Sequence, residues 1–259
     1  MATEVIRSKH YNDEIEIKFY PNSHRYQKEG EKTFLIGVTT ATGMVDKSRP
    51  LLIWSSRLTE EYLTKILNFK PIEPEDIAIA VNQYNEKRDE AADKGTQVHR
   101  WAEAYIQGEN PDTPEDEQVR NGALAFLKWV DEKQVKFLSS EKMVYSKKHN
   151  YVGTMDVIFT MGTEDHKIIH AGDFKTSSSI YLEHVMQVVA YQEAEREEFG
   201  TEYGSPYILR FDKDTGEFHS KEFADNIEEY FEGFLACLKL KELSKFWEKT
   251  HGYYSSNKK

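Results

Sequence analysis

Cysteine is almost absent from this chain of 259 residues, since Cys237 is its single example. One thiol excludes a disulfide within the chain, and it excludes a zinc or iron–sulfur site built from several cysteines. The sequence has no run of about 18 apolar residues, so it predicts no transmembrane helix and no membrane partner. Met1–Asn12 has neither the apolar core of a secretory signal nor the Arg-rich composition of a transit peptide. These absences favour a protein of a reducing cytoplasm that is not secreted.

Positive charge is also scarce, because 34 Lys and Arg face 45 Asp and Glu, for a formal net charge of −11. Contacts with nucleic-acid phosphates require Lys and Arg, so this total weakens the expectation of nucleic-acid binding. Binding depends on local patches more than on the total, however, and metal-dependent nucleases need clustered carboxylates. The hydrophobic share of 39% is sufficient for a sizeable core.

Period-2 and period-3.6 patterns predict an α/β fold with a mixed central sheet flanked by helices. Residues 1–90 form an expected N-terminal β-rich and helical region, and residues 91–259 an expected core with a C-terminal helix, packed as one compact unit. In the first half we expect strands within Glu14–Thr40, the last over Thr33–Thr40, and a helix over Leu51–Asn68. A second helical region covers Pro74–Gln107, where Gly95 leaves one helix and two helices both open. Thr113 is the expected N-cap of the next helix, with Pro114 first inside it.

The second half predicts strands within Phe137–Thr176, with turns at residues 147–150 and 162–165. Helices and strands then follow at Leu182–Phe199 (helix), Tyr207–Phe211 and Glu217–Phe223 (paired strands around residues 214–216) and Ile227–Phe246 (helix), before a polar tail from Ser255.

Two carboxylates and a lysine are expected to meet in this region. Asp173 and Lys175 lie two apart on a strand and therefore share a face, while Phe174 points to the core. A hairpin through the turn at Gly162 brings Asp156 beside Asp173. Two adjacent carboxylates repel, and a divalent cation such as Mg²⁺ relieves that repulsion. The Phe174 backbone carbonyl is a further candidate oxygen ligand.

Taken singly, these residues have ordinary interpretations. Asp-x-Lys on a strand is usually a solvated face, and Gln187 with Tyr191 is a common surface pair one helical turn apart. A lone histidine such as His99, near Trp101 and Tyr105, is more often packed than a ligand. The joint occurrence of these residues in this order is the unusual feature.

Gly153-Thr154-Met155-Asp156, Asp173-Phe174-Lys175 and Gln187-x-x-x-Tyr191 resemble the motifs of the PD-(D/E)XK nucleases, specifically the RecB-like branch. Upstream, Lys94-Gly95-Thr96-Gln97-Val98-His99 with Glu103 is similar to the helix that supplies a metal-binding histidine in RecB-like, Cas4-like and mitochondrial MGME-type exonucleases. The N-terminal segments Tyr20–Tyr26 and Gly37–Thr40 resemble phage-encoded members. The chain lacks the cluster-binding cysteines of Cas4-like enzymes, so the resemblance is to cluster-free members, without an iron–sulfur cluster.

The resemblance implies a PD-(D/E)XK restriction-endonuclease-like core and a role for each motif residue. Asp156, Asp173, His99 and the Phe174 carbonyl would bind one or two Mg²⁺ or Mn²⁺ ions, and Asp156, Asp173 and Lys175 would be catalytic. Lys175 would orient or activate the attacking water and stabilise negative charge. The supporting residues would be Glu103, Glu141, Gln187 and Tyr191. Glu103 would be a partner of His99 or a water-mediated ligand, and Glu141 would hold His99 or a metal-bound water. Gln187 would orient Lys175 or a phosphate, and Tyr191 would support the DNA backbone.

The expected activity is that of a Mg²⁺- or Mn²⁺-dependent deoxyribonuclease, with an exonuclease as the first expectation. Its substrate would be single-stranded or end-containing DNA, in repair, recombination or phage DNA processing. A structure-selective endonuclease and a non-catalytic DNA-binding module of the same fold are the alternatives. DNA is the expected partner, together with a recombination or replication protein, and the setting is a bacterial or phage-infected cell. The oligomeric state stays open.

Further DNA contacts are expected at two places. Lys147 and Lys148, at the turn before the catalytic strands, are candidates for phosphate contacts. Trp54 and Arg57, with Lys47 and Arg49, have the aromatic and cationic character that suits a single strand, because bases stack on aromatic rings. The alternative is that Trp54 belongs to the core.

Overall fold

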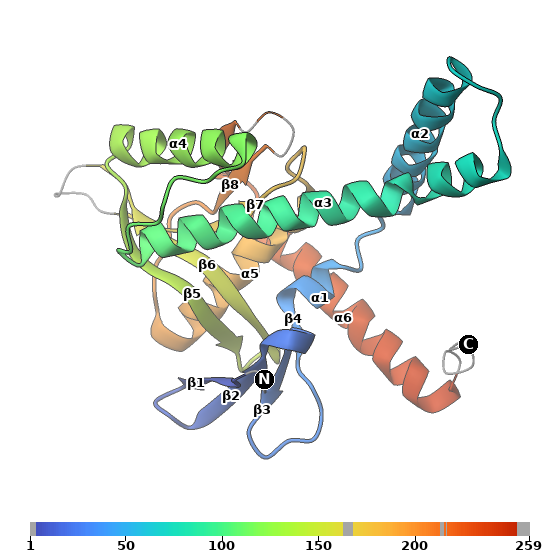
Figure 1. The fold of residues 1–259 in the computed structure, drawn as a ribbon. Coiled ribbons are helices and arrows are strands. Elements are labelled where there is room, and N and C mark those ends of the chain that lie inside the picture. The colour runs from blue at the N-terminus through green and yellow to red at the C-terminus, as the bar shows by residue number, and fades with distance from the viewer. Residues whose placement is uncertain (1–3, 163–167, 213–214, 216, 253–259) are drawn as a thin grey trace.

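The computed structural model describes residues 4–162, 168–212, 215 and 217–252. A mixed sheet lies at its centre, with helices on both faces, and a small antiparallel sheet packs at the N-terminal side (Figure 1). The α/β fold class with a mixed, helix-flanked sheet is thereby confirmed. Within the described residues, no helix is both long and apolar enough to cross a membrane.

The small sheet has the order β1-β2-β3, and the main sheet has the order β4-β6-β7-β8-β9, with β5 paired to β6. Strands β4 and β6 are parallel, as are β7 and β8, whereas β5–β6, β6–β7 and β8–β9 are antiparallel. The strands are β1 (Ile6–His10), β2 (Ile15–Tyr20), β3 (Arg25–Lys28), β4 (Ile36–Gly37), β5 (Lys136–Ser146), β6 (Tyr151–Thr160), β7 (Ile169–Lys175), β8 (Tyr207–Phe211) and β9 (Phe218–Glu222).

Each face of the main sheet has its own hydrophobic core and its own helices. Helices α1, α5 and α6 cover the face that includes Ala171 and Ile208, and α3 and α4 cover the face that includes Phe174 and Leu209. The helices are α1 (Val38–Thr42), α2 (Ser48–Leu67), α3 (Pro74–Ile106), α4 (Glu117–Glu132), α5 (Leu182–Phe199) and α6 (Ile227–His251), with a short 3-10 turn at Pro21–Ser23.

The helix α3 is continuous through Gly95, which resolves the alternatives that the sequence left open. Its start is fixed by Pro74 and by a capping box in which the Asp76 carboxylate accepts from the Glu73 amide at 3.0 Å. A Cβ atom at residue 95 would lie 2.6 Å from Thr176 Oγ1. Glycine therefore serves close packing of α3 on the end of β7, and α3 also runs across the boundary expected between residues 90 and 91.

Helix α2 and the first half of α3 form a hairpin that projects from the body, here called the arm (Figure 1). No residue of α2 is buried. Large apolar side chains on the arm are exposed, including Leu52, Phe69 and Val81. The arm thus has two layers of helix and no third element that covers it in the described chain.

Three local predictions are wrong. Thr33–Thr40 holds only the two-residue strand β4, because the chain turns into α1 at Val38, where Val38 and Ala41 are buried together. The N-cap of α4 is Asp116, whose Oδ1 accepts from the amides of Gln118 and Val119 at 2.9 and 3.0 Å, and not Thr113. Strand β1 was missed because its mostly exposed residues lack apolar alternation.

The other elements agree with the sequence to within a few residues, and α5 matches its expected range. The expected turn at 162–165 falls largely outside the described residues, and so does most of the turn at 214–216. The tail from Ser255 lies outside them as well.

Candidate active site

Strands β6 and β7 separate beside Asp156. Their paired register ends at Val157 opposite Gly172. One residue further, the Asp156 carboxylate takes the place of a backbone acceptor of β6 and accepts from the Phe174 amide at 2.7 Å. A side chain in this position satisfies a backbone donor that the separating strand no longer reaches. Asp156 is therefore held beside Asp173, as the hairpin argument predicted.

Asp173, Lys175 and Gln187 form one connected group. The Lys175 ammonium pairs with Asp173 Oδ2, and Gln187 Oε1 accepts from Lys175 Nζ at 3.2 Å. The Gln187 amide donates to Asp173 Oδ1 at 2.8 Å. Asp173 is fully buried, while Phe174 joins the opposite core, as their alternation on the strand requires. Gln187, brought in by α5, thus fixes both catalytic candidates of β7.

Tyr191 is buried and has a structural role. Its hydroxyl accepts the second proton of the Gln187 amide at 2.8 Å, and its side chain is 2% exposed. Burial of this degree contradicts the expectation that Tyr191 supports a DNA backbone. Its ring fills the space above Gly153, where a Cβ atom would lie 2.4 Å from Tyr191 Cε1. The glycine of the first motif is therefore required by close packing.

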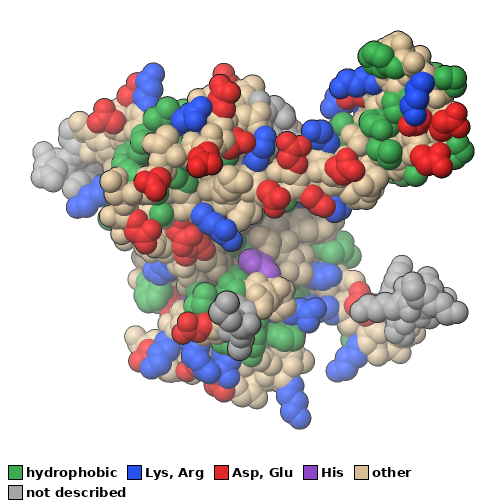
Figure 2. All heavy atoms as spheres, viewed as in Figure 1, with side chains coloured by type: hydrophobic (Ala, Val, Ile, Leu, Met, Phe, Trp, Pro, Cys, Tyr) green, Lys and Arg blue, Asp and Glu red, His purple; other side chains and the backbone are tan. Residues whose placement is uncertain are grey.

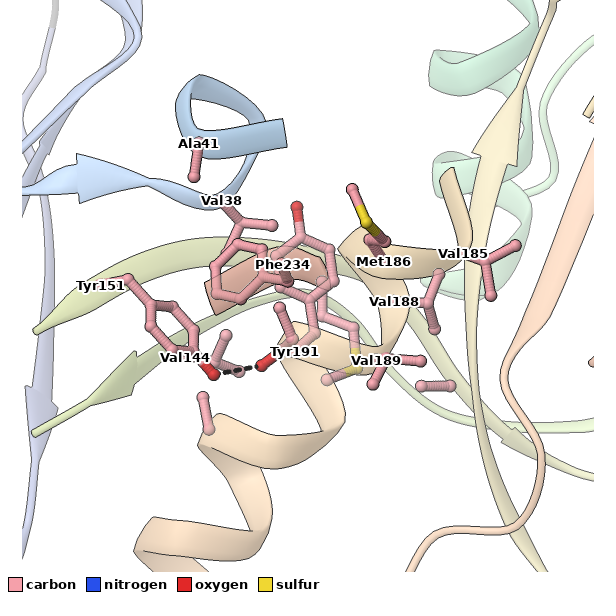
Figure 3. Packing of buried hydrophobic residues seen from close by; sticks show 14 of the residues in the cluster. Val38, Ala41, Val144, Tyr151, Val185, Met186, Val188, Val189, Tyr191 and Phe234 are labelled. Atoms are coloured by element: carbon pink, nitrogen blue, oxygen red, sulfur yellow. Dashed lines mark hydrogen bonds between the residues drawn. The ribbon is translucent and has the colours of Figure 1, made fainter. Parts of the chain in front are cut away.

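Figure 3 shows Tyr191 among the apolar side chains that anchor α5 to the sheet. Val38 of α1 and Phe234 of α6 lie in the same cluster. The Tyr151 hydroxyl donates to the Ala190 carbonyl at 2.7 Å, which fixes α5 against β6. This packing holds Gln187 in register with Asp173.

Carboxylates gather around Asp156. Glu141 lies on β5 with a φ of 49°, a left-handed conformation rare for this residue type. Burial, followed by repulsion from Asp156, Glu103 and Asp173, raises the pKa of Glu141 to about 8. Burial also raises the pKa values of Asp156 and Asp173. These groups resist ionisation together, which is the electrostatic condition that a bound cation relieves.

His99 on α3 approaches these carboxylates from the face of the main sheet that α3 and α4 cover. Its ring lies edge-on to Phe174, with centroids 5.8 Å apart. Burial lowers the pKa of His99, while Asp173, the Phe174 carbonyl and Glu103 oppose that shift. The imidazole is neutral at pH 7 and so has the form that ligates metals. The Glu103 carboxylate also accepts from Gln107 at 3.0 Å.

Lys175 stays charged in this environment. Burial lowers the pKa of its ammonium, but Asp173 and Asp156 raise it by more, so the net shift is upward. A permanently charged lysine can hold a phosphate oxygen or a water molecule and stabilise negative charge. It is not in the neutral form that a general base requires.

The chemistry of the donor set suits a hard divalent cation, since it comprises two carboxylates, a backbone carbonyl and an imidazole. Within the described residues, no three His, Cys, Asp or Glu side chains are placed to hold an ion as they stand. The Lys175 ammonium lies against Asp173 Oδ2. It would have to release that oxygen before the carboxylate could ligate an ion.

A cleft of about 1310 Å³ opens from Lys175 towards the arm. Trp54 and Arg57 line it, as expected of a strand-binding surface, and Trp54 contacts Tyr84 edge-on at 5.1 Å. Trp54 is half-buried in the arm and does not belong to a core of the main body. The remaining cations of the lining are Arg49, Lys87, Arg88, Lys94 and Lys175. Figure 2 shows Lys and Arg side chains interspersed with Asp and Glu side chains over the arm and along α3.

Lys147 and Lys148 lie at the β5–β6 turn, away from this cleft. Lys147 Nζ lies 3.4 Å from Glu14 of the N-terminal region and 5.2 Å from the Tyr11 ring centroid. The Lys148 amide donates to Glu197 at 2.7 Å. Their contacts are with the N-terminal sheet region and α5.

Two neighbours of the site were not identified from the sequence. Tyr26 of β3 is buried, and its hydroxyl lies 2.9 Å from Thr154 Oγ1, two residues before Asp156. Arg210 of β8 donates to the carbonyls of Ser177 and Ser178 at 3.1 Å, directly after Lys175. The pairing of Lys175 with Arg210 on parallel strands places this arginine, and no local motif marks it.

A scan against protein-family models gives no match to this chain. A search of curated proteins gives no similar sequence either.

Proposed function

We propose that the protein is a metal-dependent deoxyribonuclease with a PD-(D/E)XK core, hydrolysing phosphodiester bonds of DNA. The observation that carries the proposal is the convergence of Asp156, Asp173 and Lys175 at the separation of β6 and β7, tied together by Gln187. Buried adjacent carboxylates with raised pKa values are characteristic of functional sites. The group is better explained as a site for a cation and a phosphate.

Asp156, Asp173, His99 and the Phe174 carbonyl would hold Mg²⁺ or Mn²⁺. The bound ion would supply a polarised phosphoryl oxygen and a water molecule of lowered pKa. Lys175 would bind a non-bridging phosphate oxygen or the water, and Gln187 would fix the ammonium while Asp173 is engaged elsewhere. Glu141, whose pKa of about 8 keeps its carboxyl largely protonated at pH 7, would hold His99 or a metal-bound water through a hydrogen bond.

The cleft beside Lys175 supports DNA as the substrate. Arg49, Arg57, Lys87 and Arg88 supply phosphate contacts along it, and Trp54 supplies an aromatic surface. These features suit a single strand or a strand end better than a closed duplex, since bases must be unpaired in order to stack. An exonuclease is therefore the mode we propose.

The test is cleavage of end-labelled linear single strands, linear duplex and closed single-stranded circles with Mg²⁺, Mn²⁺ or EDTA. Metal-dependent loss of linear DNA with intact circles supports an exonuclease, and cut circles indicate an endonuclease. Asp173→Asn and Lys175→Ala should each abolish cleavage. Lys128→Ala is the matched control, because Lys128 is exposed on α4 and pairs only weakly with Glu132 at 3.7 Å. Absence of cleavage under every condition would contradict the proposal.

A further inference from the structure

A second group of cations and aromatic rings lies outside the cleft, where the N-terminal sheet meets α6. We call it the Phe34 patch, and it consists of Tyr20, Arg25, Phe34, Lys241 and Lys245. The Arg25 guanidinium carbon lies 5.2 Å from the centroid of the Phe34 ring. Lys245 Nζ donates to the Phe34 carbonyl at 3.4 Å. Residues far apart in sequence thus form one surface.

The ring of Phe34 is presented to solvent. Its residue is 39% exposed, although Tyr20 contacts it edge-on at 5.9 Å and Arg25 lies over it. Arg25 and Lys245 are exposed as well. An aromatic face flanked by exposed cations is the arrangement on which a nucleobase stacks while its phosphates contact the cations.

The cations of the patch lie close enough to repel one another. Burial and the neighbouring charges of Lys241 and Arg25 lower the pKa of Lys245, although Glu248 opposes that shift. Across the described chain, no carboxylate lies within ion-pair distance of Arg25, Lys241 or Lys245. Lys239 on α6, by contrast, pairs with Glu242 at 3.3 Å. In a protein of net charge −11, such a concentration of cations attracts a polyanion.

The patch is joined to the candidate active site through adjacent residues of β3. Arg25 points outward, whereas Tyr26 is buried and reaches Thr154 of β6 at 2.9 Å. Tyr26 lies close enough to Asp156 and Glu141 for their charges to raise the pKa of its hydroxyl, although burial is the larger cause. A nucleic-acid strand held on the Phe34 patch would therefore lie next to the candidate active site, on the side away from the arm.

We propose that the Phe34 patch is a second binding surface for single-stranded nucleic acid, which holds the strand beyond the cleft. The assignment of that strand as substrate rests on the proposed nuclease function. Phe34 stacks on a base, and Arg25, Lys241 and Lys245 bind its neighbouring phosphates. The cleft and the patch together would hold a longer stretch than the cleft alone.

The experiment measures binding of a fluorescent 20-nucleotide oligothymidylate in EDTA, where nothing is cut, at several salt concentrations. Phe34→Ala should weaken binding roughly tenfold, the loss expected for one stacked base. The triple variant R25Q/K241Q/K245Q should reduce the slope of log K against log salt by about 2, at ~0.7 per phosphate contact of a single strand. Phe34→Tyr should bind as the wild type does, since it retains the ring.

Lys239→Gln and Leu243→Ala are matched controls on α6, one for a paired cation and one for an exposed apolar side chain. Both should bind the oligonucleotide like the wild type. Thermal melting of each variant separates loss of the surface from loss of the fold, and the triple variant R25Q/K241Q/K245Q keeps the test valid if Phe34→Ala does not fold.

Unchanged binding by both Phe34→Ala and the triple variant would overturn the proposal. Equal binding of polyglutamate and oligothymidylate, with no effect of Phe34→Ala, would also overturn it, because the patch would then be a general anion surface. These outcomes are distinct from failure of the nuclease proposal. DNA cleavage with unaffected variants contradicts only the patch, whereas weakened binding without any cleavage contradicts only the nuclease.

Discussion

The side-chain amide of Gln187 donates to Asp173 Oδ1 at 2.8 Å, and so a helix residue sets the orientation of the central carboxylate of the site. The same side chain accepts from Lys175 at 3.2 Å. We expect Gln187→Leu to lower kcat by about 10–100-fold, because Asp173 and Lys175 lose their common partner while both remain present. Steady-state kinetics on labelled oligonucleotides measures this loss.

Gln192→Leu is the control for that variant. Gln192 is equally buried on α5, but it donates to the Gly204 carbonyl at 3.2 Å and does not contact the catalytic candidates. It should change stability with little change in kcat. Equal losses of kcat in the two variants would indicate that Gln187 supports only the packing of α5.

Gly95→Ala should lower activity although alanine is a better helix former. In an exposed helix this change stabilises by about 0.5–1 kcal/mol. Here the new Cβ would lie 2.6 Å from Thr176 Oγ1, so either the Thr176 side chain or α3 must shift beside the residue that follows Lys175. Activity should return in the double variant Gly95→Ala/Thr176→Ala, which removes the contacting oxygen. Kinetics and melting of both singles and the double test the coupling, and an additive result would contradict it.

Mn²⁺ should stabilise the wild type through the carboxylates around Asp156. At a hundredfold excess over Kd, the melting temperature should rise by roughly 5–10 °C. Asp173→Asn should lose most of this rise, whereas Asp131→Asn, an exposed change on α4, should keep it. An equal rise in the wild type and Asp173→Asn would place the ion elsewhere.

His184 should contribute a loss of stability on acidification, which is measured as the difference between the wild type and His184→Asn, because the raised pKa values of Glu141 and Asp173 act in the opposite direction. Burial lowers the pKa of His184 to about 4, and its neutral Nδ1 accepts from the Tyr181 amide at 3.3 Å at the start of α5. The unfolded chain takes up the proton near pH 6.5, whereas the folded chain resists it. The contribution is therefore complete above about pH 6.5 and is lost as the pH falls towards 4, by at most about 3 kcal/mol.

Urea unfolding at pH 7.5, 5.5 and 4.5 measures this loss. His184→Asn should gain stability relative to the wild type as the pH falls from 7.5 to 4.5, because it removes this titration while its amide oxygen can still accept from Tyr181. His219→Asn, at an exposed position on β9, should leave the dependence unchanged. An identical pH profile in wild type and His184→Asn would show that other groups cause the loss.

Much of the fold followed from periodicity, because long apolar patterns leave few alternatives. The range of α5 and the pairing of Asp156 with Asp173 are examples. Strand β4 was misjudged because Val38-Thr39-Thr40 favours a strand locally, whereas burial of Val38 with Ala41 favours a helix. At these residues tertiary packing outweighs the local preference for a strand.

The residues of the candidate site could be predicted where their side chains carry catalytic chemistry. They could not be predicted where only the folding of distant segments brings them to the site. Asp173 and Lys175 were placed on one face by their spacing, Gln187 was assigned to Lys175 by the family resemblance, and the three side chains contact one another. Tyr191 was given a role at the DNA backbone, yet its burial was not readable from a helix pattern that suited a surface pair equally well. Tyr26 and Arg210 come from distant segments, so only the folded chain places them at the site.

Because α3 is unbroken, a movement of its first half can be transmitted to its other end. The helix is about 50 Å long, with its first half in the arm and His99 near its other end, against Phe174. A helix without a break cannot absorb a tilt along its length. If the arm binds nucleic acid as proposed, a strand that tilts the arm would also shift His99 relative to Asp173, and binding of a distant nucleotide would change the geometry at the carboxylates.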